Sequence, residues 1–320
     1  MVEMITQTGL LVACLLDLLF GDPEWSSHPV RILGKTIDYL ERFLRGMKPS
    51  ILSETTAGIL LCVITITFAY GITFGIIHFA SMLNRYAGVC LTILLAYFTI
   101  SIKCLGDAAG NIRTCLKAGD DETARRHLSL IVGRDTQALN RKEMVRATVE
   151  TVAENTSDGI IAPFFYLILG GAPLGMAYKA VNTLDSMVGY KNEKYFRLGW
   201  ASARCDDLAN YIPARITGIL MIVAAIFLGK DWQNAYATLR KDARKHTSPN
   251  SGYPESAVAG ALRVQLGGVN VYDGQKKVTP LLGQDLDELS EQSIDGAVRM
   301  MYLASFMMVM LGVLFLGVLK

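Results

Sequence analysis

The sequence carries too little charge for an ordinary soluble domain. Charged residues make up 19% of its 320 residues, whereas about a quarter is typical. The formal net charge is only +2, and there is no basic tract, RNA-binding aromatic signature or zinc-finger spacing, so no nucleic-acid partner is expected. Hydrophobic residues make up 51% and the mean hydropathy is +0.32. This composition indicates a membrane protein with polar loops.

Common catalytic signatures are also missing. None of the 6 cysteines forms a CxxC pair, and the 4 histidines show no HExxH spacing, which argues against zinc sites and disulfide frameworks. We interpret the cysteines as free, mostly buried thiols. The sequence has no GxxxxGK[ST] P-loop and no kinase-type Gly-rich loop, so a nucleotide site would have to be built in another way.

Several apolar segments are candidates for transmembrane helices. They are residues 5–20, 55–83, 86–102, 160–188, 212–228 and 298–319. The residues before the first run include Glu3 and no Lys or Arg, and no small-residue cleavage site follows, so we expect a retained helix rather than a signal peptide. The predicted fold is all-α, a polytopic integral membrane protein with a single membrane-embedded domain over residues 1–320.

The segment 160–188 is interrupted by Gly170, Gly171 and Pro173. Non-helical backbone at membrane depth is tolerated where it lines a cavity. The pattern therefore predicts either one broken transmembrane helix or a re-entrant hairpin. These alternatives place the second large polar loop on opposite sides of the membrane, and both stay open at this point.

Two polar loops, residues 103–159 and 229–297, separate the apolar segments. The Lys and Arg residues of the first loop predict a cytoplasmic location. Surface helices are predicted over residues 32–43, 108–117 and 121–132, and an Ala/Gly-rich helix is predicted over residues 256–266. In the second loop, residues 248–255 are dense in turn formers, and a helix start after such a loop can hold phosphate, although ordinary loops look the same.

Glu150, Glu154 and Asp158 are spaced i, i+4 and i+8. In a helix they would share a face, where like charges repel unless a divalent cation or a cationic substrate neutralises them. Two further polar clusters follow at similar spacing. They are Lys179, Asn182 and Asp185, and then Asp206, Asp207 and Asn210. Each cluster alone is compatible with a solvated helix face, but ionisable groups beside membrane segments are costly and usually functional.

A set of motifs covers most of the chain. In order they are GDPEWSSHPVRILG, RDT at Arg134, VAENTSDGIIAPFFY, KAVNTLDSMVGYKN, ARCDDLANYIPAR and SPNSGYPESAVAGAL. Together they resemble adenosylcobinamide-phosphate synthase, the CbiB/CobD-type membrane protein family of cobalamin biosynthesis. The resemblance implies a multi-pass protein of the cell membrane. It also implies a ligase that joins adenosylcobyric acid, a corrinoid, to aminopropanol or its O-phosphate through an amide bond, with ATP as co-substrate and Mg²⁺.

Candidate site residues follow from what this chemistry requires. Activating a carboxylate as an acyl phosphate needs metal-bridged phosphates, cationic clamps and a base. The catalytic and Mg²⁺-binding candidates are Glu154, Asp158 and Asp185, with Asp206 and Asp207 in reserve, since Mg²⁺ prefers one or two carboxylates plus phosphate oxygens. The substrate- and phosphate-binding candidates are Arg134, Asn155, Lys179, Asn182, Lys191, Arg204, Asn250, Ser251 and Glu255.

Two other function classes remain as alternatives. A transporter would use the broken helix and the acidic residues to carry a cation or a corrinoid. A non-catalytic scaffold would dock other corrinoid-pathway enzymes at the lipid bilayer. The sequence shows no inverted repeat, and its two large polar loops exceed what a minimal carrier needs, so the enzyme is the favoured hypothesis.

Overall fold

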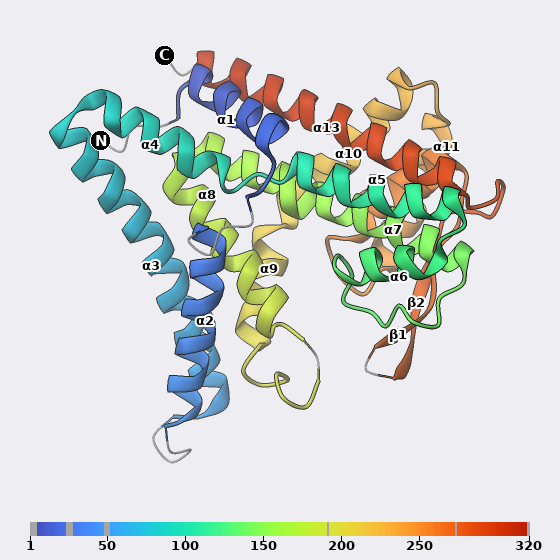
Figure 1. Cartoon of the computed structure of the whole chain (residues 1–320), viewed down its shortest axis with the longest axis horizontal. Coiled ribbons are helices and arrows are strands. Elements are labelled where there is room, and N and C mark those ends of the chain that lie inside the picture. The colour runs from blue at the N-terminus through green and yellow to red at the C-terminus, as the bar shows by residue number, and fades with distance from the viewer. Residues whose placement is uncertain (1–4, 24–27, 48–51, 191, 273, 319–320) are drawn as a thin grey trace. The chain divides into compact units, whose positions relative to one another are not determined.

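The computed structural model describes residues 5–23, 28–47, 52–190, 192–272 and 274–318. Helices dominate this part of the chain (Figure 1), which confirms the all-α prediction. Within it, 4 helical segments are long and apolar enough to cross a membrane. They are Glu54–Leu83, Arg85–Ala118, Arg141–Val188 and Glu291–Val318. The pair Trp200–Ala209 and Tyr211–Phe227, bent by 46°, would make a fifth span. The protein is therefore a polytopic membrane protein.

The chain divides into two compact units, and the first comprises Met1–Ser101, Ala162–Asn210 and Val309–Lys320. Its helices are α1 (Gln7–Phe20), α2 (Pro29–Arg45), α3 (Glu54–Leu83), α4 (Arg85–Tyr97), α8 (Ala162–Val188), α9 (Trp200–Ala209) and the end of α13 (Glu291–Val318). The buried side chains of Ile37, Leu61 and Leu184 join α2, α3 and α8 in one apolar core. Burying such side chains is the main stabilising contribution in this unit.

Local sequence signals explain the corners of the first unit. Asn84 ends α3 and begins α4, and its side chain accepts a hydrogen bond from the backbone N–H of Tyr86. The predicted apolar segments 55–83 and 86–102 are therefore joined by a tight turn, and α3 and α4 pack against each other. The predicted break is also present, because Gly170 and Gly171 are non-helical within α8 and Gly171 has φ of 66°. Only glycine takes that conformation without strain.

The second unit comprises Ile102–Ile161 and Tyr211–Met308. Its helices are α5 (Ile102–Ala118), α6 (Asp121–Ser129), α7 (Arg141–Thr156), α10 (Tyr211–Phe227), α11 (Trp232–Asp242), α12 (Gly252–Leu262) and most of α13. A π-helical turn, η1 (Ser157–Ile161), follows α7 directly, and a short 3₁₀ turn, η2 (Ala243–Lys245), follows α11. A reciprocal capping box between Asn140 and Glu143 begins α7, which satisfies two otherwise unpaired backbone donors.

A β-hairpin in the second unit is not among the predicted elements. Strands β1 (Leu266–Tyr272) and β2 (Gln275–Leu282) pair antiparallel, with an irregularity between Leu266 and Gly268. The helix predicted over residues 256–266 therefore ends earlier, at Leu262. Arg263 follows it with φ of 60°, and this left-handed residue stops the helix.

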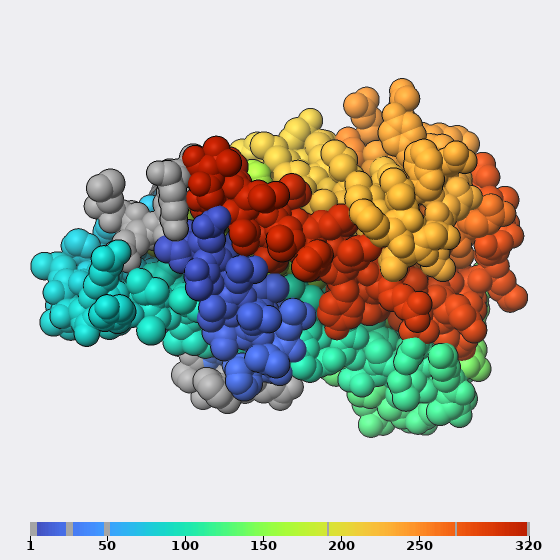
Figure 2. Space-filling view, turned by 90° about the horizontal axis from the view of Figure 1, so that it is seen from above, coloured from blue at the N-terminus to red at the C-terminus, as the bar shows by residue number. Residues whose placement is uncertain are grey.

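Apolar side chains on the long helices are exposed. Phe79 of α3 is 65% exposed, and on α13 Phe306 and Leu314 are 61% and 65% exposed. Figure 2 shows α13 as a red band along the surface of the face in view. Soluble proteins rarely expose apolar patches of this extent, so these surfaces are consistent with contact to lipid.

Candidate functional site

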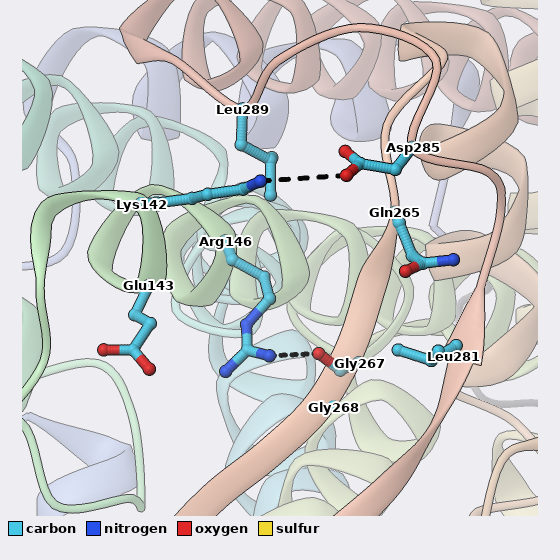
Figure 3. Close-up of a pocket in the computed structure, with 9 residues that line it drawn as sticks. All are labelled: Lys142, Glu143, Arg146, Gln265, Gly267, Gly268, Leu281, Asp285 and Leu289. Carbon is cyan, nitrogen blue, oxygen red and sulfur yellow. Dashed lines mark hydrogen bonds and ion pairs between the residues drawn. The ribbon is translucent and has the colours of Figure 1, made fainter.

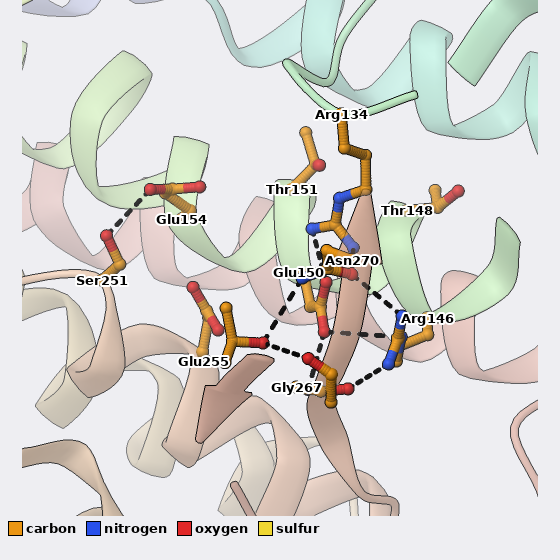
Figure 4. A network of polar contacts seen from close by, with 12 residues as sticks. Arg134, Arg146, Thr148, Glu150, Thr151, Glu154, Ser251, Glu255, Gly267 and Asn270 are labelled. Carbon is orange, nitrogen blue, oxygen red and sulfur yellow. Dashed lines mark hydrogen bonds and ion pairs between the residues drawn. The ribbon is translucent and has the colours of Figure 1, made fainter. Parts of the chain in front are cut away.

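The first polar network of the second unit is centred on Glu150 of α7 (Figure 4). Arg134 donates from Nη2 to Glu150 Oε2 at 2.6 Å and from Nη1 to Asn270 Oδ1 at 2.8 Å. The backbone N–H of Gly267 donates to the other Glu150 oxygen at 2.7 Å. Arginine therefore neutralises Glu150, the first member of the i, i+4, i+8 row, without any bound cation.

Arg146 lies one turn before Glu150 and connects α7 to β1. Its guanidinium donates to the carbonyl oxygen of Gly267, and to Val269 O and Asn270 Oδ1 at 3.0 Å each. Gly267 has φ of 85°, and an added Cβ there would lie 2.1 Å from the carbonyl oxygen of Pro280. Glycine is thus required where the strand approaches both Glu150 and Arg146.

A second group of acidic side chains lies next to this network. Ser251 Oγ donates to Glu154 Oε1 at 2.8 Å, and Glu255 is buried in the first turn of α12. Burial raises the pKa of Glu255 well above its ordinary value, and the charges of Glu154, Glu150 and Asp158 raise it further. A carboxylate in such surroundings favours a proton or another cation. We call Glu154, Ser251 and Glu255 the carboxylate cluster.

The loop before α12 holds the carboxylate cluster in place. The Ser248 hydroxyl accepts hydrogen bonds from the backbone N–H groups of Asn250 and Ser251, at 3.2 and 3.3 Å. His246 Nδ1 accepts from the Ser248 N–H at 3.0 Å, and its Nε2 lies 3.8 Å from Glu255 Oε1. The turn-rich segment predicted to bind substrate therefore presents Ser251 and Glu255 from an ordered loop.

The three predicted Mg²⁺ ligands come from both units of the chain. In the described ranges, no group of three His, Cys, Asp or Glu side chains could hold a metal ion. Glu154 and Asp158 belong to the second unit and Asp185 to the first. Mg²⁺ usually needs only one or two carboxylates when phosphate oxygens complete its shell, and Glu154 and Glu255 lie close enough for the charge of Glu154 to act on Glu255. Residues of the carboxylate cluster therefore fit the protein's share of such a site.

The first unit contains a separate polar network on α8 and α9. Asn210 donates from Nδ2 to Asp206 Oδ1 at 3.0 Å and accepts from the Tyr178 hydroxyl at 2.8 Å. Asn182 also hydrogen-bonds to Asp206, and the charge of Asp185 acts on it. The rings of Tyr166 and Tyr178 stack at 4.9 Å. The second and third clusters of the sequence thus meet in one network.

The other predicted residues make local contacts. Asn155 donates to the carbonyl of Thr151 in its own helix at 3.0 Å, and Arg204 pairs with Asp207 at 3.3 Å in an exposed ion pair. Lys179 lies on α8 next to Tyr178. Lys191 lies outside the described residues. Arg134 is paired with Glu150 and also donates to Asn270, so its guanidinium helps to position these two side chains.

Several polar residues of these networks are absent from the sequence-based set. They are Arg146, Tyr166, Tyr178, His246 and Asn270. Tyr166 stands inside a quoted motif, and Tyr178 directly precedes one. Arg146 and Asn270 lie outside all the motifs, and their roles follow from contacts across more than a hundred residues.

A small cavity opens beside the Glu150 network (Figure 3). Its volume is about 200 Å³, and Arg146, Gln265 and Gly267 are among the residues that line it. Lys142 and Asp285 face each other across it at 3.8 Å. None of the predicted site residues lines this cavity, so it is distinct from the carboxylate cluster.

Comparison with known proteins identifies the family. Residues 10–301 match the family model described as CobD/Cbib protein. A "Cobalamin biosynthesis protein CobD" of Geobacter metallireducens is 49% identical over 309 residues, which is 96% of each chain. Proteins of the same name from Pelobacter propionicus (47%, covering 94% of this chain and 92% of the relative) and Klebsiella pneumoniae (42%, 98% of each) are also similar. No solved structure matches. The chain belongs to the CobD/CbiB family of cobalamin biosynthesis proteins.

Proposed function

We propose that the protein is an ATP-dependent ligase of the cell membrane that joins adenosylcobyric acid to aminopropanol or its O-phosphate. The family supports a role in cobalamin biosynthesis. The observation that carries the finer proposal is the buried carboxylate cluster, in which Glu255 has a strongly raised pKa. An amine that must be bound as a cation and then lose a proton suits such a site.

The reaction has two chemical steps. First, the corrinoid carboxylate takes the γ-phosphoryl group of ATP, which forms an acyl phosphate and releases ADP. The amine nitrogen then attacks the acyl carbon, the C–N bond forms, the C–O bond breaks, and phosphate leaves. Mg²⁺, when bound, would neutralise the phosphate oxygens during phosphoryl transfer. The amine can attack only after it has lost its proton.

The carboxylate cluster supplies what the amine requires. Glu154 would hold the incoming ammonium by charge, and burial makes this attraction stronger than in water. The ammonium would favour the ionised form of Glu255, and a carboxylate with a raised pKa is a stronger base than an ordinary glutamate. Glu255 is therefore the proposed base, Glu154 the proposed binding group, and Ser251 fixes the orientation of Glu154.

The network of the first unit is proposed to bind the corrinoid. Asp185, Asp206 and Asn182 present amide and carboxylate groups from α8 and α9. Such groups would hydrogen-bond to the carboxamide side chains of a corrinoid, with Tyr178 and Asn210 as positioning residues. Asp185 would contact the corrinoid substrate.

The test is an end-point assay on detergent-purified protein with adenosylcobyric acid, aminopropanol phosphate, ATP and Mg²⁺. We expect the corrinoid to gain the mass of the amide product, and Glu154→Gln and Glu255→Gln to abolish that gain. Glu122→Gln is the matched control, because the Glu122 side chain is 89% exposed. Corrinoid binding without conversion would contradict the proposal, and uptake into proteoliposomes would then test transport.

A further inference from the structure

Arg215 of α10 contacts two tyrosine rings. Its guanidinium carbon lies 3.4 Å from the ring centre of Tyr211 and 4.3 Å from that of Tyr253. Its Nη1 donates to the carbonyl oxygen of Tyr211. The rings come from α10 and α12, which pack against each other.

Arg215 has no acidic partner in the part of the chain that the structure describes. Its contacts there are the two rings and the Tyr211 carbonyl. The side chain is half-buried. In the same unit, Arg134 and Arg113 both pair with carboxylates. Arg215 is thus held by two rings and a carbonyl oxygen, with no carboxylate against it among the described residues.

A stacked guanidinium is prepared to bind an oxyanion. The two rings and the Tyr211 carbonyl restrict the guanidinium, so little conformational freedom is lost when a ligand binds, and the planar N–H fork matches two oxygens of a phosphate. Stacking on tyrosine also compensates for part of the lost hydration of the cation. A lysine in this position would lack both the stacking and the fork.

The elements around Arg215 are those that carry the carboxylate cluster. Tyr253 stands between Ser251 and Glu255 in α12 and its preceding loop, and η1, which contains Asp158, packs against α10. We infer that Arg215 binds a phosphate group of a substrate in the proposed ligase reaction. The inference rests on the proposed function. The phosphate belongs either to ATP or to the amino alcohol phosphate, and binding measurements separate these sources.

The experiment uses full-length protein in detergent and equilibrium dialysis with two radiolabelled probes, ATP with Mg²⁺ and aminopropanol phosphate. We expect Arg215→Gln to weaken one of the two by about tenfold to a hundredfold, as loss of a charge-assisted hydrogen-bond pair would. Arg215→Lys should lose most of this affinity. If the affected probe is aminopropanol phosphate, KM for unphosphorylated aminopropanol should stay unchanged.

Two controls separate binding from folding. Arg240→Gln removes another arginine beside a tyrosine, at 5.7 Å in exposed surroundings, and should leave both affinities unchanged. Tyr253→Leu keeps Arg215 but removes one ring, and should weaken the same probe several-fold, whereas Tyr253→Phe should not. These tyrosine variants also decide the question if Arg215→Gln does not fold.

The outcomes distinguish this inference from the ligase proposal. Wild-type affinity of Arg215→Gln for both probes would overturn it and leave Arg215 as an anchor at the membrane interface. Failure of the wild-type protein to bind either probe would also overturn the inference that Arg215 binds a phosphate. Arginine-dependent binding without any amide product would support the phosphate site and reject the ligase.

Discussion

Arg134 and Glu150 form an ion pair of 2.6 Å in which the side chains are only 11% and 7% exposed. Because both charges are shielded from water, removal of Arg134 leaves the buried Glu150 carboxylate with only the more distant Arg146, at 3.8 Å, as a cationic partner. We expect Arg134→Gln to lower the free energy of unfolding by about 3–5 kcal/mol. Thermal denaturation in detergent, compared with the wild type, measures this loss.

The double variant Arg134→Gln with Glu150→Gln tests the cause. It should be more stable than Arg134→Gln alone, because the buried Glu150 carboxylate is removed together with its closest cationic partner. Arg204→Gln is the surface control, since Arg204 is 66% exposed in its pair with Asp207, and it should cost less than about 1 kcal/mol. Equal effects of Arg134→Gln and Arg204→Gln would contradict the assignment.

Glu255 should make the stability of the protein depend on pH. Its pKa is raised in the folded state, so the folded protein keeps a proton that the unfolded chain loses as pH rises past the ordinary glutamate pKa. Stability therefore falls as pH rises from the ordinary pKa to the raised one. Glu255→Gln removes this titration. As pH rises from the ordinary glutamate pKa to the raised one, the melting temperature of the variant should therefore increase relative to that of the wild type.

The control for the pH dependence is an exposed carboxylate. Glu122→Gln removes a carboxylate whose side chain is 89% exposed, so it measures the effect of losing a surface carboxylate alone. If Glu255→Gln behaves in the same way, the carboxyl group of Glu255 titrates normally. Addition of a cation that binds the carboxylate cluster should reduce the difference, since it would favour the ionised form.

The parts of the fold that were predicted from sequence depend on local signals. Asn84 between two apolar runs and Gly170–Gly171 inside one determine the backbone within a few residues. The β-hairpin was missed although Val269, Val271 and Val278 favour strands, because the surrounding loop is polar and short strands carry weak periodic signals. The Asp-Gly pair at residues 273–274 of the sequence is a local signal that favours a hairpin turn.

The site was harder to predict because its contacts are not local. Glu150 was singled out by its spacing, but its partner Gly267 lies 117 residues further along the chain. The i, i+4, i+8 argument also assumes a continuous α-helix. Here α7 ends at Thr156, and the π-helical turn η1 places Asp158 outside that regular row. Such turns are frequent at functional sites.

Gly267 should tolerate no side chain. Its φ of 85° is unfavourable for other residues, and an added Cβ would meet the carbonyl of Pro280 at 2.1 Å. Gly274 in the same hairpin has φ of 76° but open space around it. We expect Gly274→Ala to cost about 1–2 kcal/mol from the backbone alone, and Gly267→Ala to cost clearly more in the same denaturation assay. Similar costs would show that the backbone of β2 can move away.

The hydrogen bond from Ser251 to Glu154 should affect catalysis less than the carboxylates themselves. Ser251→Ala keeps the charge of Glu154 but frees its orientation, so turnover should fall about tenfold, whereas loss of the proposed base in Glu255→Gln should cost about 10²–10⁴-fold. Single-turnover measurements of amide formation, made at a temperature where each variant is folded, compare these rates. The rate in Glu255→Gln should also lose its rise with pH, because an amide side chain cannot accept the amine proton, while Ser251→Ala should retain it. If Ser251→Ala lost the pH dependence and Glu255→Gln kept it, the roles of the two side chains would have to be exchanged, with Glu154 as the base that Ser251 tunes.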